Sequence, residues 1–465
     1  MKKTGIERVA EYIFENKNGI CTEDAREKAR LCLLDELGCG IYGSTVPEGK
    51  KILKAMYSVH EKGKCNVWGT TAMFSPETAA FINGSLCHMR ELDDVHFAIL
   101  HTGAVCVPTA LAAAQIRNSQ VQDVLDGIIL GVETAVRIAE GMDFLDHRER
   151  GWHGTSTIGV FGAAAAAGYL LGLNKEEVIN ALGIAGSRTG GTWAFAADGA
   201  MTKRLHPGMA ARDGMMAALL AREGLQGPHY ILEAHDGGIY RVMSSSWNLN
   251  HIERPSKPAI EDIEFKWFAS CKSVHSPFSA AAQLYRRHPE KSPEDIQEIH
   301  VYVNRSAIEM AGGQYQKDSV MSAQISIPYG VALGLWGHMG TAEDYCEECL
   351  GREELARTAA MVKVEESQDM NKLRKEEKRS AAVVEVLWKD GSRDQAFEKA
   401  PKGSMFHPLD RQDIIEKFYR LTQPLMDRKD AEKICRFVME ENRSEKISGL
   451  TEILQEVTYG KGWIF

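Results

Sequence analysis

Four short segments of the sequence place histidines, lysines and carboxylates inside otherwise apolar stretches. The first holds Asp93 and Asp94 next to His96 and His101. Such a group can bind a metal ion or transfer protons, because imidazole titrates near neutral pH and a neighbouring carboxylate can orient it. The same pattern is typical of a turn in which an aspartate caps a helix that begins near Pro108. We favour chemistry for Asp94 and His101, and the turn for the other two residues.

Two further segments stand where buried helices are expected to begin. His153 lies next to a glycine at the start of an alanine-rich stretch, and Lys203, Arg204 and His206 precede another small-residue stretch. The free N–H groups at a helix N-terminus favour an anion, and basic side chains beside them would bind a carboxylate a second time. Solvated surface charge is the alternative for the basic cluster. We interpret it as part of a binding site.

The fourth segment runs from Lys266 to His275 and is rich in aromatic and small residues. It lies at an expected domain junction, where small-molecule sites are frequent. Tyr329 precedes a later apolar helix and could offer a phenol to the same cleft.

The sequence contains no recognisable metal motif. Cys346 and Cys349 form a lone Cys-x-x-Cys pair, which favours two ordinary cysteines over a zinc site, and His-Glu-x-x-His and Gly-x-Ser-x-Gly are absent from the sequence. Removing a proton next to a carboxylate builds negative charge, which needs a base on one side and cations on the other. The residues therefore favour proton abstraction from a di- or tricarboxylate, followed by elimination, epimerisation or decarboxylation.

Helices are expected to position most of these residues. Apolar residues recur at helical spacing from Val121 to Val136, and Asn174 with Glu177 predicts a capped helix over Lys175–Ser187. Residues 29–41, 158–171 and 208–220 are apolar on nearly every face, as in the middle of a large helical domain. The glycines at 159, 162 and 168 indicate close helix packing and do not fit a dinucleotide fingerprint.

The pattern changes after about residue 260. Alternating apolar residues predict strands near 299–303 and 384–388, the second before the turn dipeptide at 390–391, and 361–364 is a third strand candidate. The charged run 365–378 is interpreted as a solvated helix or loop. We predict a mainly α fold in which residues 1–264 and 399–465 form one helical domain, with a smaller α+β lid domain inserted at 265–398.

Composition narrows the function further. The 465 residues carry 55 lysines and arginines against 64 aspartates and glutamates, a net charge of −9, which disfavours nucleic-acid binding. We find no basic-then-apolar leader and no run of roughly 18 uncharged apolar residues, so no membrane segment is expected. The ten cysteines are scattered through apolar stretches. We expect them to be reduced and the protein to be cytoplasmic.

The four segments, in this order, resemble the MmgE/PrpD family, which includes 2-methylcitrate dehydratase, cis-aconitate decarboxylase and iminodisuccinate epimerase. The resemblance covers nearly the whole chain and is carried by residues 33–39, 80–84, 93–94, 101, 151–153, 203–208, 266–275, 326–329 and 401–403. It implies a helical domain with a small α+β lid, usually a homodimer, and no metal or organic cofactor. It also implies a site with catalytic residues His101, His153, Asp94 and Tyr329 and substrate-binding residues Lys203, Lys266, His275 and His206.

Three departures from the family pattern concern this site. Val95 stands where the dehydratase and decarboxylase branches typically carry threonine, His101-Thr102-Gly103 is one residue shorter than the usual motif, and Cys271 replaces a histidine of decarboxylase-like members. These changes argue against cis-aconitate decarboxylase. The leading hypothesis is a cofactor-independent hydro-lyase of the 2-methylcitrate dehydratase type that acts on a small di- or tricarboxylate. An epimerase of the iminodisuccinate epimerase type is the runner-up.

Two hypotheses from other classes stay open at this point. A catalytically inactive helical scaffold would not need this set of residues together: Lys203, His206, Lys266, His275 and Tyr329. A metallohydrolase would rest on the carboxylates and histidines of the first segment, and metal analysis of the purified protein would decide it.

Overall fold

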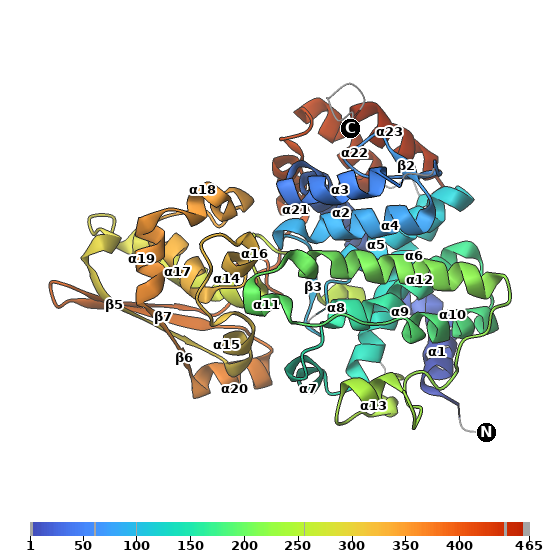
Figure 1. Ribbon diagram of the computed structural model, residues 1–465, viewed down its shortest axis with the longest axis horizontal. Helices are drawn as coiled ribbons and strands as arrows, with labels where there is room; N and C mark the ends of the chain where they lie inside the picture. Colours follow the sequence, from blue (N-terminus) through green and yellow to red (C-terminus); the bar gives the residue numbers. More distant parts are fainter. Residues whose placement is uncertain (1–2, 60–61, 99, 255, 441–443, 459–465) are drawn as a thin grey trace.

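The protein folds into a large helical part and a smaller part built on a four-stranded sheet (Figure 1). This computed structural model describes residues 3–59, 62–98, 100–254, 256–440 and 444–458. Helices dominate, so the prediction of a mainly α protein with a small sheet is confirmed.

The helical part comes mostly from the first 250 residues. Its helices are α1 (Gly5–Ile20), α2 (Glu23–Thr45), α3 (Pro47–Tyr57), α4 (Pro76–Cys87), α5 (Gly103–Arg117), α6 (Val121–Glu140), α7 (Phe144–Glu149), α8 (Gly154–Thr157), α9 (Gly159–Leu171), α10 (Lys175–Ser187), α11 (Phe195–Asp198), α12 (His206–Arg222) and α13 (Ile239–Met243). Helix α10 begins as predicted, because the Asn174 side chain accepts from the Glu177 N–H and the Glu177 carboxylate accepts from the Asn174 N–H.

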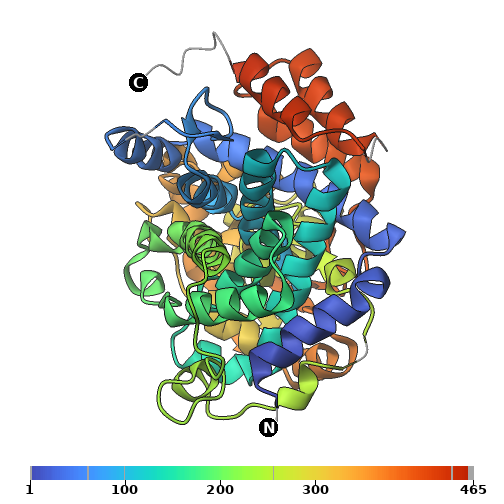
Figure 2. The ribbon, with the colours of Figure 1, turned by 90° about the vertical axis from the view of Figure 1, so that its right-hand side faces the viewer.

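The C-terminal helices return to this part. They are α21 (Arg411–Thr422), α22 (Arg428–Met439) and α23 (Ser448–Thr458), and α21 packs against α2. Figure 2 shows these helices, in red, beside the N-terminal ones in blue. A buried ion pair joins the two chain ends, since Lys417 Nζ lies 2.6 Å from Asp35 Oδ1.

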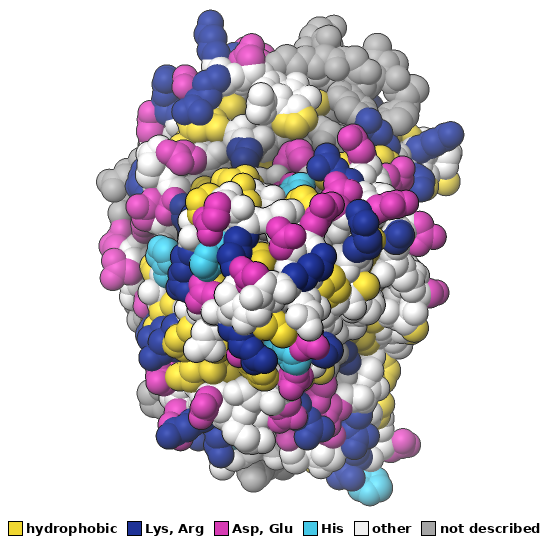
Figure 3. Space-filling view, turned by 90° about the vertical axis from the view of Figure 1, so that its left-hand side faces the viewer, with side chains coloured by type: hydrophobic (Ala, Val, Ile, Leu, Met, Phe, Trp, Pro, Cys, Tyr) yellow, Lys and Arg dark blue, Asp and Glu magenta, His cyan; other side chains and the backbone are white. Residues whose placement is uncertain are grey.

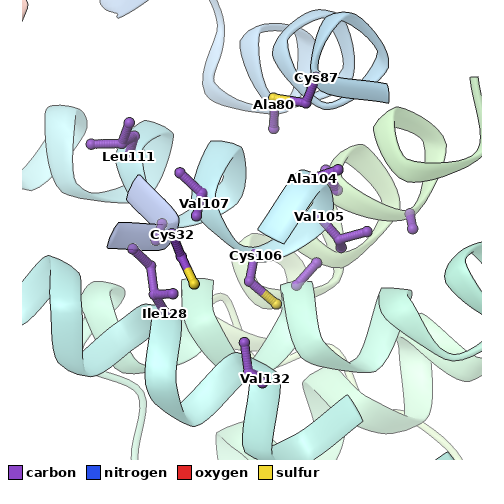
Figure 4. Close-up of a cluster of buried hydrophobic side chains, with 14 of the residues drawn as sticks. Cys32, Ala80, Cys87, Ala104, Val105, Cys106, Val107, Leu111, Ile128 and Val132 are labelled. Carbon is purple, nitrogen blue, oxygen red and sulfur yellow. The ribbon is translucent and has the colours of Figure 1, made fainter. Parts of the chain in front are cut away.

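Small side chains let the central helices approach closely. A methyl group on Gly162 of α9 would lie 2.8 Å from the carbonyl oxygen of Gly131 on α6. Valines and cysteines fill the neighbouring layer, and Cys32 and Cys106 place their sulfurs among apolar side chains (Figure 4). The ten cysteines are free thiols, and all except the half-buried Cys346 are buried.

The expectation that no uncharged apolar stretch reaches roughly 18 residues was wrong. The stretch Gly154–Leu171 is uncharged, long and apolar enough to cross a membrane by length and composition alone, and 94% of it is buried inside the protein. Its apolar surface is therefore covered by neighbouring helices of the same chain, as the all-round apolar pattern predicted.

The sheet has the strand order β6-β5-β7-β8. Its strands are β5 (Ile296–Val303), β6 (Val362–Glu366), β7 (Ala382–Trp388) and β8 (Arg393–Glu398); β5 runs parallel to β6 and antiparallel to β7, and β7 and β8 form the predicted hairpin. The accompanying helices are α14 (Lys272–Arg287), α15 (Arg305–Ala311), α16 (Val320–Gln324), α17 (Ile327–Leu335), α18 (Glu347–Leu350), α19 (Glu353–Met361) and α20 (Gln368–Glu377).

The sheet part has its own hydrophobic core, which extends from Cys271 to Ala396. Its outer face carries intermixed positive and negative side chains with scattered apolar ones (Figure 3). The helix α14 packs against α17 and against strands β7 and β8.

Two-residue strands complete the fold. Strands β1 (Cys65–Asn66) and β2 (Met73–Phe74) pair, as do β3 (Val95–His96) and β4 (Ile263–Glu264). The second pair matters for function, because it holds the segment after Asp94 against the segment before Lys266. Residues far apart in the sequence thereby meet at one place.

Candidate active site

A glutamate in an unusual backbone conformation anchors the site. Glu91 follows the short 3₁₀ helix His88–Arg90 and has a φ of 53°, in the left-handed region that non-glycine residues rarely adopt. This turn directs the fully buried Glu91 carboxylate toward three cations. Backbone strain of this kind persists only where surrounding contacts hold it.

The three cations are Lys203, Arg204 and Lys266. Lys203 and Arg204 both contact Glu91 Oε1, and Lys266 Nζ donates to Glu91 Oε2 at 2.9 Å. Burial opposes the charged carboxylate, but the cations, led by Lys203, hold the pKa of Glu91 well below its usual value. Burial lowers the pKa of Lys203, whereas Glu91 and Asp93 outweigh burial at Lys266 and raise its pKa.

Gln324 fixes the position of this cluster. The Arg204 guanidinium donates to Gln324 Oε1 at 2.7 Å, and the Gln324 amide donates to the carbonyl oxygens of Arg90 and Ala269 at 2.8 and 2.7 Å. Because Gln324 ends helix α16, this side chain links the sheet part to the helical part at the site.

Asp93 orients two histidines. Its Oδ2 accepts from His88 Nδ1 at 2.8 Å and lies 3.1 Å from His101 Nδ1, which also donates to the Asp94 carbonyl oxygen at 2.8 Å. A carbonyl can only accept, so the neutral His101 carries its proton on Nδ1. Burial would raise the pKa of Asp93, but His88, His101 and Lys266 hold it well below the usual value.

His101 is therefore prepared to act as a base. It lines a cavity, and its Nε2 makes no hydrogen bond to any described residue. Burial lowers the pKa of His101 below its ordinary 6.5, which keeps the ring neutral at pH 7. The same cause lowers the pKa of His88 to about 3.

His153 lines the same cavity from the start of helix α8. Its Nδ1 lies 2.7 Å from His206 Nδ1, so one of the two rings donates and the other accepts. Burial holds the pKa of His153 well below 6.5 and lowers that of His206 to about 4. His206 itself supports His153 from behind and does not line the cavity.

The cavity lies between the helical part and the sheet part. The space open to the centre of a water molecule is about 80 Å³. A single water needs roughly 10–15 Å³ by this measure, so there is room for several waters or a small polycarboxylate. Six cations and two carboxylates of the described residues line it: Lys203, Lys272, Arg374, Lys378, Arg379 and Lys399, with Glu91 and Glu264.

Asp94 occupies a different place from the predicted one. Its Oδ1 accepts from the Gly103 N–H at 2.9 Å, so it caps the start of α5, five residues before Pro108. The Glu36 carboxylate accepts from the Asp94 N–H at 3.3 Å, and burial raises the pKa of Asp94 to about 7 and that of Glu36 well above its usual value. The carboxylate that contacts the histidines is that of Asp93, whereas Asp94, which was predicted to be catalytic, caps a helix.

Two other predicted residues lie away from the cavity lining. The Tyr329 hydroxyl donates to the Asp344 carbonyl oxygen at 2.8 Å, and its ring packs between Tyr315 and Tyr345. His275 Nε2 donates to the Ser270 carbonyl oxygen at 3.3 Å and its ring contacts Phe268. Among the eight predicted site residues, His101, His153 and Lys203 line the cavity.

One group of the described residues has the composition of a metal site. Ligand atoms of His88, Asp93 and His101 all lie within 4.8 Å of one another. Both Nδ1 atoms in this group already donate to oxygens, and the third side chain supplies the accepting carboxylate. The geometry fits a proton-transfer group, in which an acidic residue orients the base.

Several functional residues were missed or undervalued from the sequence. His88 and Gln324 had no motif to mark them, and Asp93 was assigned to a turn. Glu91 was assigned no role, although it lies two residues before Asp93. A signal for Glu91 did exist, since three buried cations require a buried anion near them.

Comparisons with known proteins agree with this arrangement. The MmgE/PrpD N-terminal domain model matches residues 7–251, and the MmgE/PrpD C-terminal domain model matches residues 268–441. Cis-aconitate decarboxylase of Aspergillus terreus is 29% identical over 460 residues, covering 93% of this chain and 92% of that protein. The Homo sapiens cis-aconitate decarboxylase is 29% identical over 485 residues, covering 98% of this chain and 95% of that protein.

A second group of relatives carries a different name. The 2-methylcitrate dehydratase of Salmonella typhimurium is 26% identical over 364 residues, which cover 73% of each chain. Both groups of relatives are lyases of polycarboxylates, in keeping with a cavity that is lined by three imidazoles (His96, His101 and His153) and an excess of cations. By both domain matches, which together span nearly all of the sequence, this chain belongs to the MmgE/PrpD family.

Proposed function

We propose that the protein is a cofactor-independent lyase that removes a proton next to a carboxylate of a small di- or tricarboxylate. The observation that carries this proposal is the neutral His101, whose Nε2 makes no hydrogen bond to a described residue, in a cavity with six cations and two carboxylates. A base and several cations in one desolvated space are what a carbanion-like transition state requires.

The contacts of His101 support the proton transfer. When Nε2 takes the proton, the ring becomes an imidazolium that still donates from Nδ1 to the Asp94 carbonyl. The Asp93 carboxylate, 3.1 Å from Nδ1, stabilises the positive charge that has formed. On the substrate, the charge that develops on the carboxylate faces Lys203 and Lys272, both of which line the cavity.

His153 provides the second proton-transfer group. In a hydro-lyase reaction a hydroxyl group leaves from the neighbouring carbon and needs a proton to depart as water. His153 lines the same cavity and its partner His206 contacts it at 2.7 Å; once this pair has bound one additional proton, His153 can pass that proton to the departing hydroxyl. This division of roles supports a dehydratase of the 2-methylcitrate type as the leading reaction.

Decarboxylation is the second candidate, favoured by similarity. The cis-aconitate decarboxylases align at 29% identity over more than 90% of the chain, whereas the Salmonella typhimurium dehydratase aligns at 26% over 73%. Against it, Val95 and Cys271, two departures from the family pattern, both line the cavity. A site altered where the substrate binds supports a substrate other than cis-aconitate.

The experiment is proton NMR of the purified enzyme with 2-methylcitrate, citrate, cis-aconitate and iminodisuccinate. New olefinic signals from a hydroxy acid are expected and would establish the dehydratase. Consumption of cis-aconitate with release of carbon dioxide would establish the second candidate. Inversion of iminodisuccinate with no elimination product would replace both lyases by an epimerase.

The proposal also covers the assembly and location of the enzyme. We propose a homodimer, as the family resemblance implies, and a cytoplasmic location, which the free, mostly buried cysteines support. Light scattering after size-exclusion chromatography tests the dimer, and fractionation of the source cells tests the location.

A further inference from the structure

Arg374 lines the cavity, and its contacts differ from those of the cavity cations that pair with carboxylates. It lies on helix α20, in the charged run that the sequence indicated to be solvated, yet its side chain is half-buried and lines the cavity. The interpretation of the whole run as solvated was therefore wrong at this position. Its neighbours Lys372 and Lys375 are exposed, as expected.

The Arg374 guanidinium is held in place without an anion. It lies 4.0 Å from the centre of the Phe97 ring and donates to Ser380 Oγ at 3.1 Å. No carboxylate oxygen of the described residues lies within 4 Å of it. Phe97 precedes His101 by four residues, so the contact places this charge on the wall that leads to the proposed base.

The other cavity cations have carboxylate partners, with one exposed exception. Lys203 contacts Glu91, Lys272 lies 3.3 Å from Glu264, and Arg379 and Lys399 lie 2.8 and 3.1 Å from Glu377. Lys378 is exposed to solvent, where water stabilises its charge. Glu264 is the acid that acts on Arg374 from farther away, and it is already engaged by Lys272 and by the Met405 N–H.

A half-buried guanidinium without a counter-charge gains strongly from an anion that displaces water from it. Burial lowers the pKa of Arg374, in agreement with an environment that lacks a counter-charge. Five N–H donors in a planar fork match the two oxygens of one carboxylate. The platform of Phe97 and the hydrogen bond to Ser380 hold this fork before any ligand arrives.

From these contacts we infer that Arg374 binds a carboxylate of the substrate that is remote from the carbon at which His101 acts. The inference rests on the proposed function and narrows it to substrates with a second carboxylate on the chain. Lys203 and Lys272 hold the carboxylate next to the reacting carbon, and Arg374 holds the distant one from the sheet part. A substrate that spans the cavity thereby contacts both parts of the molecule.

The test measures binding of propane-1,2,3-tricarboxylate, a saturated tricarboxylate with no hydroxyl group or double bond to react. Isothermal titration calorimetry compares the full-length wild type with Arg374→Gln, Arg374→Lys and Lys372→Gln. The last variant removes the same charge from an exposed position of the same helix. Circular dichroism and thermal unfolding verify that each variant is folded.

We expect Arg374→Gln to raise the dissociation constant roughly tenfold to a hundredfold, the loss of charge-assisted hydrogen bonds. Arg374→Lys keeps the charge without the fork and should bind with intermediate affinity, while Lys372→Gln should bind like the wild type. If Arg374→Gln also binds like the wild type, Arg374 is not a carboxylate ligand, and the proposed lyase stands without it.

Two other outcomes would also overturn the inference. An equal loss of affinity in Lys372→Gln and Arg374→Gln would mean that the overall positive charge of this region, and not a specific contact with Arg374, determines binding. Absence of binding to the wild type, together with no reaction in the NMR panel, would reject both the inference and the proposed function. Absence of binding with a positive NMR reaction would reject the inference alone.

Discussion

A buried cluster of cations beside the cavity and a single cation on the cavity wall are stabilised in opposite ways. The inner group, Lys203, Arg204 and Lys266, is buried and shares the carboxylate of Glu91. The outer residue, Arg374, has an aromatic ring and a hydroxyl as partners and no carboxylate among the described residues. The inner charges are therefore already shared with Glu91 before a substrate binds, although Lys203 also lines the cavity, and the outer charge has no carboxylate partner of its own among the described residues.

Because of this difference, we expect the inner cluster to matter mainly for the stability of the fold and Arg374 mainly for ligand binding. A buried ion cluster holds its members in fixed positions, and removing one member leaves uncompensated charge. An unpaired cation at a cavity wall contributes little to folding, but its interaction becomes strong when an anion displaces water from it. Substitutions in the two groups should consequently give opposite patterns of stability and binding.

The largest effect is expected for Glu91→Gln. Three buried cations would lose their shared anion, so the free energy of unfolding should fall by about 3–5 kcal/mol, the usual cost of breaking a buried ion pair. Urea denaturation of the variant measures it. Glu376→Gln, exposed on α20, is the control and should unfold like the wild type. An unchanged midpoint for Glu91→Gln would mean that the inner cluster does not stabilise the fold.

The next effect is catalytic. His101→Gln should lower kcat/KM by roughly 10²–10⁴-fold, the contribution of a positioned general base, while the unfolding midpoint changes little. Steady-state kinetics with the substrate found by NMR measures the loss. His235→Gln, at an exposed loop position, should keep full activity. Full activity in His101→Gln would remove this residue from the mechanism.

The pH dependence follows from the same base. Only neutral His101 accepts a proton, and burial lowers its pKa below 6.5, so the fall of kcat/KM toward acid pH should have its midpoint below pH 6.5. A pH profile of the wild type measures the position of this acid limb. A limb centred above pH 6.5 would contradict the assignment, because an exposed or charge-stabilised group would then be the base.

The smallest effect is expected for the stability of Arg374→Gln. Because the guanidinium has no carboxylate partner among the described residues, the free energy of unfolding should change by no more than about 0.5 kcal/mol, the range of ordinary surface substitutions. Urea denaturation beside Glu91→Gln provides the comparison. A loss as large as that of Glu91→Gln would show that the outer cation also supports the fold.

Much of the fold could be predicted from local pattern. The capped helix Lys175–Ser187 and the alternating strand Ile296–Val303 follow from periodicity and capping residues that act within a few positions. The site was harder to predict, because tertiary contacts decide which of its side chains lie together. Asp93 and Asp94 are neighbours of the same type, yet Asp93 contacts the histidines and Asp94 caps helix α5, a difference that the local sequence does not reveal.

Tyr329 and Arg374 are two further residues whose surroundings could not be predicted from the local sequence. Tyr329 looked functional because it precedes an apolar helix near the expected cleft, but it lies within helix α17, buried in the core between two other tyrosines. Arg374 looked solvated because charged residues surround it in sequence, but one face of α20 meets Phe97. A charge run does not reveal which of its members faces a neighbouring part of the molecule.

The central claim is that His101 removes a proton next to a carboxylate. Its most direct test is proton NMR in D₂O, which follows solvent deuterium at the α-carbon of the reacting substrate in the wild type and in His101→Gln. The account predicts that the wild type loses the α-proton signal, by exchange or elimination, and that the variant retains it. Equal loss of this signal in both proteins would contradict the claim.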